Sequence, residues 1–302
     1  MTFTAQLQAA ERRADSMLCV GLDPEPARFP GAWRGDASRI FDFCAAIVDA
    51  THDLVSAFKP QIAYFAAQRA EHQLERLIAH INRVAPAVPV ILDAKRGDIG
   101  ATAAMYAAEA FERYQADALT LSPFMGFDSI EPYFKYPGKG LFLLCRTSNP
   151  GGSDLQGQRL VGGGGDGSPG PGSPAAAATA SHSQPGDRLF EHIARLAAGP
   201  WNRNGQLGLV VGATFPAEIA RVRALAPSLP LLIPGVGAQG GDAQATVQAG
   251  WRGSQAPGAA HSSGPIIVNS SRAVLYASAG ADFASAARAV ADTTRQALNA
   301  AR

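Results

Sequence analysis

Eight short apolar segments recur along the 302 residues, and stretches with helical periodicity lie between them. Strands that are apolar on both faces are typical of parallel sheets, because helices cover such sheets. We therefore predict an α/β fold in which residues 1–302 form one (β/α)8 TIM barrel. The predicted strands are residues 17–22, 54–58, 88–93, 118–121, 140–145, 207–211, 230–233 and 264–268. A doubly wound open sheet is the alternative.

Two segments interrupt this alternation and are predicted to be insertions. Residues 161–186, after the fifth strand, are almost all Gly, Ser, Pro and Ala. Such a segment buries too little apolar surface to offset the entropy of ordering it, which predicts a disordered surface loop. Its position beside the barrel mouth keeps a lid as the alternative. Residues 250–264, before the eighth strand, are a shorter insertion of the same kind.

The formal net charge of +1 lacks the excess of positive charge typical of nucleic-acid-binding proteins. An anionic ligand would have to be bound by basic groups within its own site. No apolar window approaches the roughly 18 residues of a membrane span, and no signal peptide is indicated. We expect a cytoplasmic protein. Cys19, Cys44 and Cys145 lack the paired spacing of zinc ligands and are expected to be buried, although Cys145 could instead face a pocket.

Charged residues follow the first three predicted strands: Asp23, Lys59, Asp93, Lys95 and Asp98. Parallel α/β folds keep their chemistry at the carboxyl ends of the strands. Because buried charges are costly unless they are paired, we expect these groups to line a pocket mouth, where cations and anions keep each other ionised. Taken singly, Asp98 could cap the next helix and Lys95 could be a solvated loop residue.

A glycine-rich turn follows the seventh predicted strand. Residues 235–240, Gly-Val-Gly-Ala-Gln-Gly, match the G-x-G-x-x-G spelling of dinucleotide sites, but such sites follow a first strand. In TIM barrels the loops after strands seven and eight often bind phosphate through backbone N–H groups, and Arg272 would add a guanidinium. A tight turn without a ligand is the alternative.

Several of these motifs together resemble the orotidine 5'-phosphate decarboxylase family. The stretch Asp93-Ala-Lys-Arg-Gly-Asp98 carries the resemblance together with Lys59, residues 234–241 and the pair Ser271-Arg272. Residues 58–64 and 146–151 resemble the longer bacterial branch of that family. The resemblance implies a homodimeric TIM barrel that converts orotidine 5'-phosphate to UMP and CO2, the last step of pyrimidine nucleotide synthesis, without cofactor or metal.

The resemblance also implies roles for the charged strand ends. Lys95 would protonate carbon 6 of the pyrimidine and, as a cation, stabilise the carbanion that forms there. Asp93 would lie against the departing carboxylate and orient Lys95. Lys59 would complete the network and, with Asp23, bind the ribose hydroxyls.

The remaining implied contacts involve the partner subunit, the pyrimidine and the phosphate. Asp98, Ile99 and Thr102 would reach across a dimer interface into the partner's site. Ser148 would read the pyrimidine edge, with Thr147 as the alternative. The phosphate would be held by Gly237, Gln239 and Arg272.

Two rival functions stay open. Within the superfamily, 3-keto-L-gulonate 6-phosphate decarboxylase and hexulose 6-phosphate synthase share the Asp-x-Lys-x-x-Asp strand end but use magnesium; Lys59 argues against them, because the resemblance implies an acid at that position. The second rival is a catalytically silent phosphosugar-binding barrel. The four confined charges at Lys59, Asp93, Lys95 and Asp98 argue against it, since binding alone does not need them.

Overall fold

The computed structural model describes residues 1–161, 186–236, 241–253 and 264–302. Eight parallel strands in these ranges form one sheet in the order β2-β1-β8-β7-β6-β5-β4-β3. The strands are β1 Leu18–Leu22, β2 Ala57–Pro60, β3 Ile91–Arg96, β4 Ala118–Leu121, β5 Gly140–Arg146, β6 Leu207–Val211, β7 Leu231–Pro234 and β8 Ile266–Ser270. Parallel bridges Phe58–Val90 and Gln61–Asp93 join β2 to β3 and close the sheet. The prediction of a (β/α)8 barrel is therefore confirmed.

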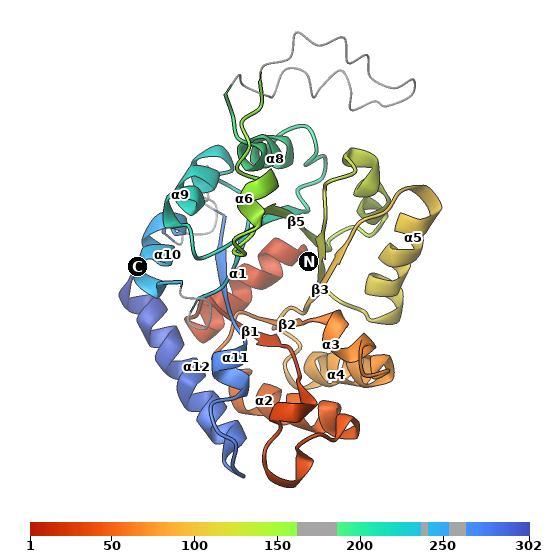
Figure 1. Ribbon diagram of the computed structural model, residues 1–302, viewed down its shortest axis with the longest axis vertical. Helices are drawn as coiled ribbons and strands as arrows, with labels where there is room; N and C mark the ends of the chain where they lie inside the picture. Colours follow the sequence, from red (N-terminus) through yellow and green to blue (C-terminus); the bar gives the residue numbers. More distant parts are fainter. Residues whose placement is uncertain (162–185, 237–240, 254–263) are drawn as a thin grey trace.

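Helices surround the barrel (Figure 1). They are α1 Phe3–Ala14, α2 Ile40–Thr51, α3 Ile62–Ala66, α4 Glu71–Val84, α5 Gly100–Ala108, α6 Gly152–Leu155, α8 Leu189–Ala198, α9 Pro216–Leu225, α10 Ala243–Gly250, α11 Arg272–Leu275 and α12 Phe283–Ala300. In α4, the buried residues Leu74, Leu77, Ile78 and Ile81 recur at helical spacing, so one face packs on the barrel and the other meets solvent.

Helix α1 closes one end of the barrel. Phe3 and Leu7 pack against an inner layer of the barrel to which each strand contributes one side chain. This layer consists of Cys19, Ala57, Ile91, Ala118, Phe142, Val210, Leu232 and Ile267. The ring of Phe3 meets the ring of Phe142 edge to face, with centroids 5.5 Å apart. Because this end is filled with apolar side chains, a pocket can form only at the opposite end, where the strands finish.

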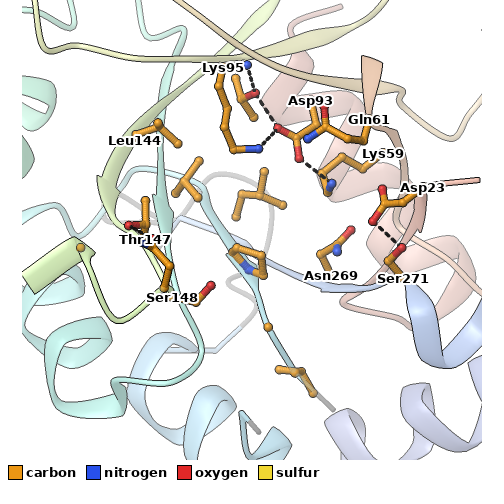
Figure 2. Close-up of a pocket in the computed structure, with 18 of the residues that line it drawn as sticks. Asp23, Lys59, Gln61, Asp93, Lys95, Leu144, Thr147, Ser148, Asn269 and Ser271 are labelled. Carbon is orange, nitrogen blue, oxygen red and sulfur yellow. Dashed lines mark hydrogen bonds and ion pairs between the residues drawn. The ribbon is translucent and has the colours of Figure 1, made fainter. Parts of the chain in front are cut away.

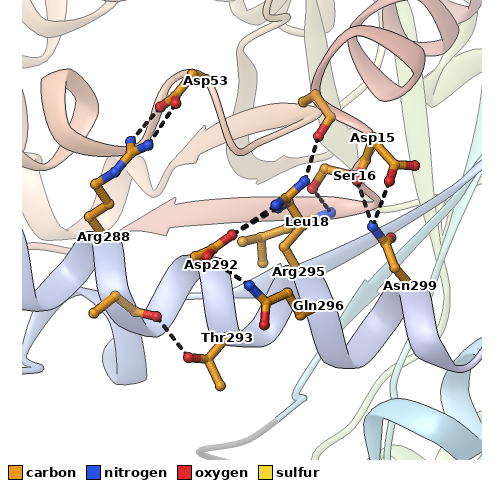
Figure 3. A network of polar contacts seen from close by, with 12 residues as sticks. Asp15, Ser16, Leu18, Asp53, Arg288, Asp292, Thr293, Arg295, Gln296 and Asn299 are labelled. Carbon is orange, nitrogen blue, oxygen red and sulfur yellow. Dashed lines mark hydrogen bonds and ion pairs between the residues drawn. The ribbon is translucent and has the colours of Figure 1, made fainter.

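The carboxyl-terminal helix is tied to the start of the chain by polar contacts (Figure 3). Arg288 forms two hydrogen bonds, of 2.6 and 2.8 Å, with the carboxylate of Asp53 after α2. Further along α12, the side-chain amide of Asn299 donates to the backbone oxygen of Asp15 (2.8 Å), and Arg295 donates to the backbone oxygen of Ala14 (3.2 Å). These contacts fix α12 beside α1 and α2.

Several predicted boundaries were displaced. The second strand was predicted at residues 54–58 but occupies Ala57–Pro60, because Leu54 and Val55 are buried in the preceding turn. The eighth strand ends at Ser270, two residues later than predicted. Asp98 does not cap α5: the N-cap residue is Ile99, and Asp98 Oδ1 accepts a hydrogen bond from the adjacent Ile99 N–H (2.8 Å).

The two predicted insertions lie mostly outside the described residues. The first insertion, predicted at 161–186, falls after β5, and the second, predicted at 250–264, falls before β8. The residues that frame the second insertion are joined by Arg223. This buried guanidinium donates to the backbone oxygens of Gly250 (2.8 Å) and Pro265 (3.4 Å), and burial lowers the pKa of Arg223 to about 10. Arg223 therefore holds the end of α10 beside the start of β8.

Candidate active site

A cavity of about 610 Å³ opens where the strands end, opposite α1. Leu144, Val210 and Leu232, from β5, β6 and β7, form apolar parts of its wall. Its polar lining includes Asp23, Lys59, Gln61, Tyr64, Asp93, Lys95, Thr120, Thr147, Ser148, Asn269, Ser271 and Arg272. Figure 2 shows the charged groups of β2 and β3 on one side of this cavity and Thr147 and Ser148 on another.

Asp93 lies between two lysine side chains. Its Oδ2 is 2.7 Å from Nζ of Lys59, and its Oδ1 is 2.6 Å from Nζ of Lys95 (Figure 2). Lys59 and Asp93 are buried, with 4% and 7% of their surface exposed, whereas the side chain of Lys95 is 46% exposed. Lys95 is therefore the ammonium that a ligand in the cavity can reach most directly.

The two buried charges stabilise each other. Burial by itself raises the pKa of Asp93, but Lys59 and Lys95 outweigh it and hold this pKa below its usual range. Burial lowers the pKa of Lys59, but Asp93 and Asp23 outweigh it and raise this pKa above its ordinary value. At neutral pH the carboxylate is ionised and the ammonium of Lys59 is protonated.

Thr120, at the end of β4, fixes the end of β3. Its hydroxyl donates to Asp93 Oδ1 (2.9 Å) and accepts from the backbone N–H groups of Ala94 (3.0 Å) and Lys95 (2.9 Å). The backbone of Lys95 has a φ of 48°, in the left-handed region that residues other than glycine rarely adopt. Strained conformations of this kind cluster at functional sites, where the surroundings hold them in place.

Asp23, after β1, is held from two sides. Oγ of Ser271 donates to Asp23 Oδ2 (2.6 Å), and the phenol of Tyr276 donates to the backbone oxygen of Asp23 (2.9 Å). The same phenol accepts from the backbone N–H of Glu25 (2.7 Å). Asp23 Oδ1 is buried and has no hydrogen-bond partner among the described residues. One carboxylate oxygen is therefore left for a ligand.

The loop after β5 contributes two hydroxyl groups to the cavity, and that of Thr147 is engaged within the loop. The side chain of Gln156 accepts from the Thr147 N–H (2.8 Å) and donates to Thr147 Oγ1 (3.0 Å). Thr147 Oγ1 in turn donates to Asn149 Oδ1 (2.7 Å). A side chain at Gly152 would place its Cβ 2.8 Å from Thr147 Oγ1. Thr147 and Ser148 both line the cavity, and the hydroxyl of Thr147 is held by its neighbours in the loop.

Arg146 anchors that loop to the helix layer. Its side chain is buried, pairs through Nε with Glu218 of α9, and donates to Oγ of Ser153 (2.9 Å). The guanidinium also stacks on Phe215, 4.1 Å from the ring centroid. The position of the β5 loop thus depends on an ion pair beneath it.

The sequence and the structure both place this chain among known proteins. A family model described as "Orotidine 5'-phosphate decarboxylase / HUMPS family" matches residues 16–165. The orotidine 5'-phosphate decarboxylase of Methylibium petroleiphilum is 71% identical over 302 residues and is covered in full, as is this chain. The orotidine 5'-phosphate decarboxylase of Leptothrix cholodnii is 72% identical over 301 residues, and the match covers 100% of this chain and 98% of that enzyme. The chain belongs to the orotidine 5'-phosphate decarboxylase family.

A solved structure agrees with this assignment. The OMP decarboxylase of Leishmania donovani superposes with a TM-score of 0.75 at 36% identity, and the match covers 99% of both chains. The resemblance to the orotidine 5'-phosphate decarboxylase family seen in the motifs is thereby confirmed.

Most site residues predicted for this member of the orotidine 5'-phosphate decarboxylase family come together. Six of them line the cavity, namely Asp23, Lys59, Asp93, Lys95, Ser148 and Arg272, and so does Thr147, the alternative to Ser148. Gly237 and Gln239 lie outside the described residues. On either side of them, the Gly241 N–H donates to the Gly235 oxygen (3.0 Å). Asp98, Ile99 and Thr102 are not part of the cavity lining of their own chain.

Polar residues of the cavity that the sequence analysis gave no role include Gln61, Tyr64, Thr120, Gln156 and Asn269. Thr120 lies inside the apolar run of β4, where threonine is common. Asn269 directly follows the apolar residues of β8, as a single asparagine that gives no periodic signal. Gln61 and Tyr64 follow Lys59 closely in the sequence. Their nearness to a charged strand end was the available signal.

The three cysteines are free and buried, as expected. Burial raises the pKa of Cys19 to about 12, and it raises the pKa values of Cys44 and Cys145 as well. Cys145 donates through Sγ to the backbone oxygen of Phe190 (3.2 Å) and does not line the cavity. In the part of the chain that the structure describes, no helix is long and apolar enough to cross a membrane.

Proposed function

We propose that this chain converts orotidine 5'-phosphate to UMP and CO2, with Lys95 as the proton donor. The observation that carries the proposal is the pairing of a half-exposed Lys95 ammonium with buried Asp93, 2.6 Å away, in a cavity that also holds Lys59. The printed names of the full-length relatives support the reaction.

The chemistry needs a fixed cation next to carbon 6. When the bond from carbon 6 to the carboxylate breaks, its electron pair stays on carbon 6 in the plane of the ring, where the π system gives little help. The ammonium of Lys95 would stabilise this carbanion and then transfer a proton to carbon 6, while CO2 leaves. Preorganised charges of this kind cost no reorganisation during the reaction.

Asp93 and Lys59 would position that ammonium. Asp93 accepts a hydrogen bond from Lys95 on Oδ1 and from Lys59 on Oδ2. The ammonium of Lys95 is therefore held beside Oδ1, while Lys59 occupies the other oxygen. Asp93 would also lie against the departing carboxylate of the substrate. Lys59 would keep the charge of Asp93 balanced in a buried setting, where an unpaired carboxylate is costly.

The rest of the substrate would be held by three further groups of residues. Asp23 and Lys59 would bind the ribose hydroxyls, and Ser148 would bind the pyrimidine edge. Arg272 would hold the phosphate together with Gly237 and Gln239. Arg272 supplies a fork of N–H donors that matches phosphate geometry. Binding the phosphate there would help to fix the reacting carbon at Lys95.

The chain would work as a homodimer with shared sites. Ile99 and Met105 of the α5 region and Phe124 and Met125 after β4 are large apolar residues exposed by 53%, 66%, 75% and 46%. Their elements are neighbours, because β3 pairs with β4. An exposed apolar surface of this kind is typical of an association site. It would bring Asp98, Ile99 and Thr102 of one subunit toward the cavity of the other.

The test is product analysis with and without metal. Purified protein should convert orotidine 5'-phosphate to equimolar UMP and CO2 in the presence of EDTA. Activity that appears only after magnesium is added would favour the metal-dependent sugar-phosphate enzymes of the superfamily. Tight binding of UMP without turnover of orotidine 5'-phosphate would favour a silent binding barrel.

We further propose a cytoplasmic location, which fractionation of the source cells would test.

A further inference from the structure

Asn269 is a polar residue on the inner face of the barrel to which the proposed mechanism gives no task. It lies on β8, beside β1 and β7, and its side chain lines the cavity. Only 7% of its surface is exposed. Figure 2 shows its amide on the same side of the cavity as Lys59, Asp23 and Ser271, away from Ser148.

The amide of Asn269 is not satisfied by the protein around it. Its Oδ1 is buried and lacks a hydrogen-bond partner among the described residues. An unsatisfied buried polar group costs roughly 1–3 kcal/mol, and an apolar residue would avoid this cost at an inner barrel position. Because the two ends of an amide exchange by a half-turn of the side chain, either the oxygen or the NH2 group can face a ligand.

The neighbouring strand makes room for this amide. Position 21 on β1 is glycine, and a Cβ there would lie 3.0 Å from Oδ1 and 3.2 Å from Nδ2 of Asn269. The same Cβ would lie 2.8 Å from Cβ of Ser271, the residue that holds Asp23. Gly21 therefore lets Asn269 and Ser271 approach β1 together.

Asp23 shares the incomplete hydrogen bonding of Asn269. Ser271 occupies its Oδ2, while its Oδ1 has no partner among the described residues. An ionised carboxylate can only accept hydrogen bonds. A hydroxyl bound to Asp23 would donate its proton there, and its oxygen would still need a donor. Lys59 uses one of its N–H groups on Asp93 and keeps others for the ribose, and the amide of Asn269 adds a neutral donor on the same wall as Asp23.

We propose that Asn269 binds a ribose hydroxyl of the nucleotide, donating through Nδ2 to the hydroxyl oxygen while Asp23 accepts the hydroxyl proton. The inference rests on the proposed function, since it places a ribonucleotide in the cavity. It makes Asn269 a residue that distinguishes ribonucleotides from deoxyribonucleotides. A polar site built around a hydroxyl rejects the analogue that lacks it, because the buried polar groups are then left unpaired.

The test compares three nucleotides by calorimetry: UMP, 2'-deoxy-UMP and 3'-deoxy-UMP. The wild-type chain should bind UMP on the order of 10-fold more tightly than the analogue that lacks the contacted hydroxyl. The variant Asn269→Ala should bind UMP on the order of 10-fold more weakly and keep only a reduced preference, because Asp23 still accepts from the hydroxyl but its oxygen has lost the amide donor. Asn269→Ser, whose hydroxyl is too short to reach, should behave in the same way.

Ser270→Ala is the matched control, since Ser270 is the next residue of β8 and does not line the cavity. It should keep both the affinity and the preference of the wild-type chain. Equal weakening of all three nucleotides by Asn269→Ala would overturn the hydroxyl contact, and so would unchanged binding. A wild-type chain that binds UMP but shows no turnover would overturn the proposed reaction and leave the contact standing. A wild-type chain that binds none of the three would overturn both.

Discussion

Nζ of Lys95 lies 2.6 Å from Oδ1 of Asp93, two residues earlier on β3. The pairing of β3 with β4 shifts register between Leu92 and Arg96, and this irregular strand end carries both the acid and the ammonium into the cavity. The left-handed backbone at Lys95, held by the hydroxyl of Thr120, sets the direction of the lysine side chain. A short strand end thus supplies both charges on which the proposed chemistry depends.

Removal of the carboxylate at Asp93 should destabilise the fold. In Asp93→Asn the ammonium of Lys59, which is 4% exposed, loses its ionic partner, and loss of one member of a buried pair costs about 3–5 kcal/mol. Urea unfolding at neutral pH measures the change in the free energy of unfolding. The control is Asp53→Asn, whose partner Arg288 is 45% exposed, and a change below about 1 kcal/mol is expected there. Equal effects of the two substitutions would contradict the assigned burial.

The same pair predicts how stability depends on pH. The pKa of Asp93 is lower in the folded chain, so its contribution is present above about pH 4 and is lost as the pH falls through the folded pKa. The pKa of Lys59 is higher in the folded chain, so its contribution is present below about pH 10 and is lost as the pH rises through the folded pKa. The wild-type contribution of this pair should therefore change little from about pH 5 to 9. In Asp93→Asn, burial without the carboxylate lowers the pKa of Lys59, so the stability difference between the two chains should be larger at pH 5 than at pH 9. A difference that grows as the pH rises from 5 to 9 would contradict these shifts.

The thiols should be unreactive in the folded protein. Cys19, Cys44 and Cys145 are buried and burial raises their pKa values, so at pH 8 little thiolate is present and no reagent can reach it. A chromogenic disulfide reagent should titrate no thiol before denaturation and three afterwards. Rapid reaction of the native chain would contradict this arrangement.

Loss of the ion pair beneath the β5 loop should weaken substrate binding. Glu218→Gln removes the charge that holds Arg146, and the loop with Ser148 should then be less well positioned. We expect KM for orotidine 5'-phosphate to rise on the order of 10-fold, with a smaller change in kcat. Glu75→Gln, which breaks the exposed pair with Arg113, is the control and should leave both constants unchanged. A fall in kcat alone would argue against a positioning role for Arg146.

Shared active sites should be detectable by mixing inactive chains. Lys95→Ala and Asp98→Ala homodimers should both lack activity, yet a mixed dimer contains one cavity with both residues intact. After random exchange of subunits, about a quarter of all sites should be active. Absence of activity in verified mixed dimers would place Asp98 outside the partner's site.

The sequence predicted the barrel well because its strands are apolar on both faces. The predicted start of the second strand was wrong, because apolar residues are not always paired in the sheet: Leu54 and Val55 are buried but precede β2. The charged strand ends were visible because Lys59 and Asp93 interrupt apolar runs. Asn269 was not visible in this way, since its importance depends on the absence of a side chain at Gly21 on another strand. Relations of that kind require the fold.

The central claim is that the ammonium of Lys95 carries the reaction, and the ultraviolet absorbance change of orotidine 5'-phosphate tests it most directly. In EDTA, the wild-type chain should turn over rapidly, and Lys95→Ala should be slower by at least about 10²–10⁴-fold while still binding UMP. Lys135→Ala, which removes an exposed lysine outside the cavity, should match the wild type. A Lys95→Ala chain with a rate close to that of the wild type would contradict the account.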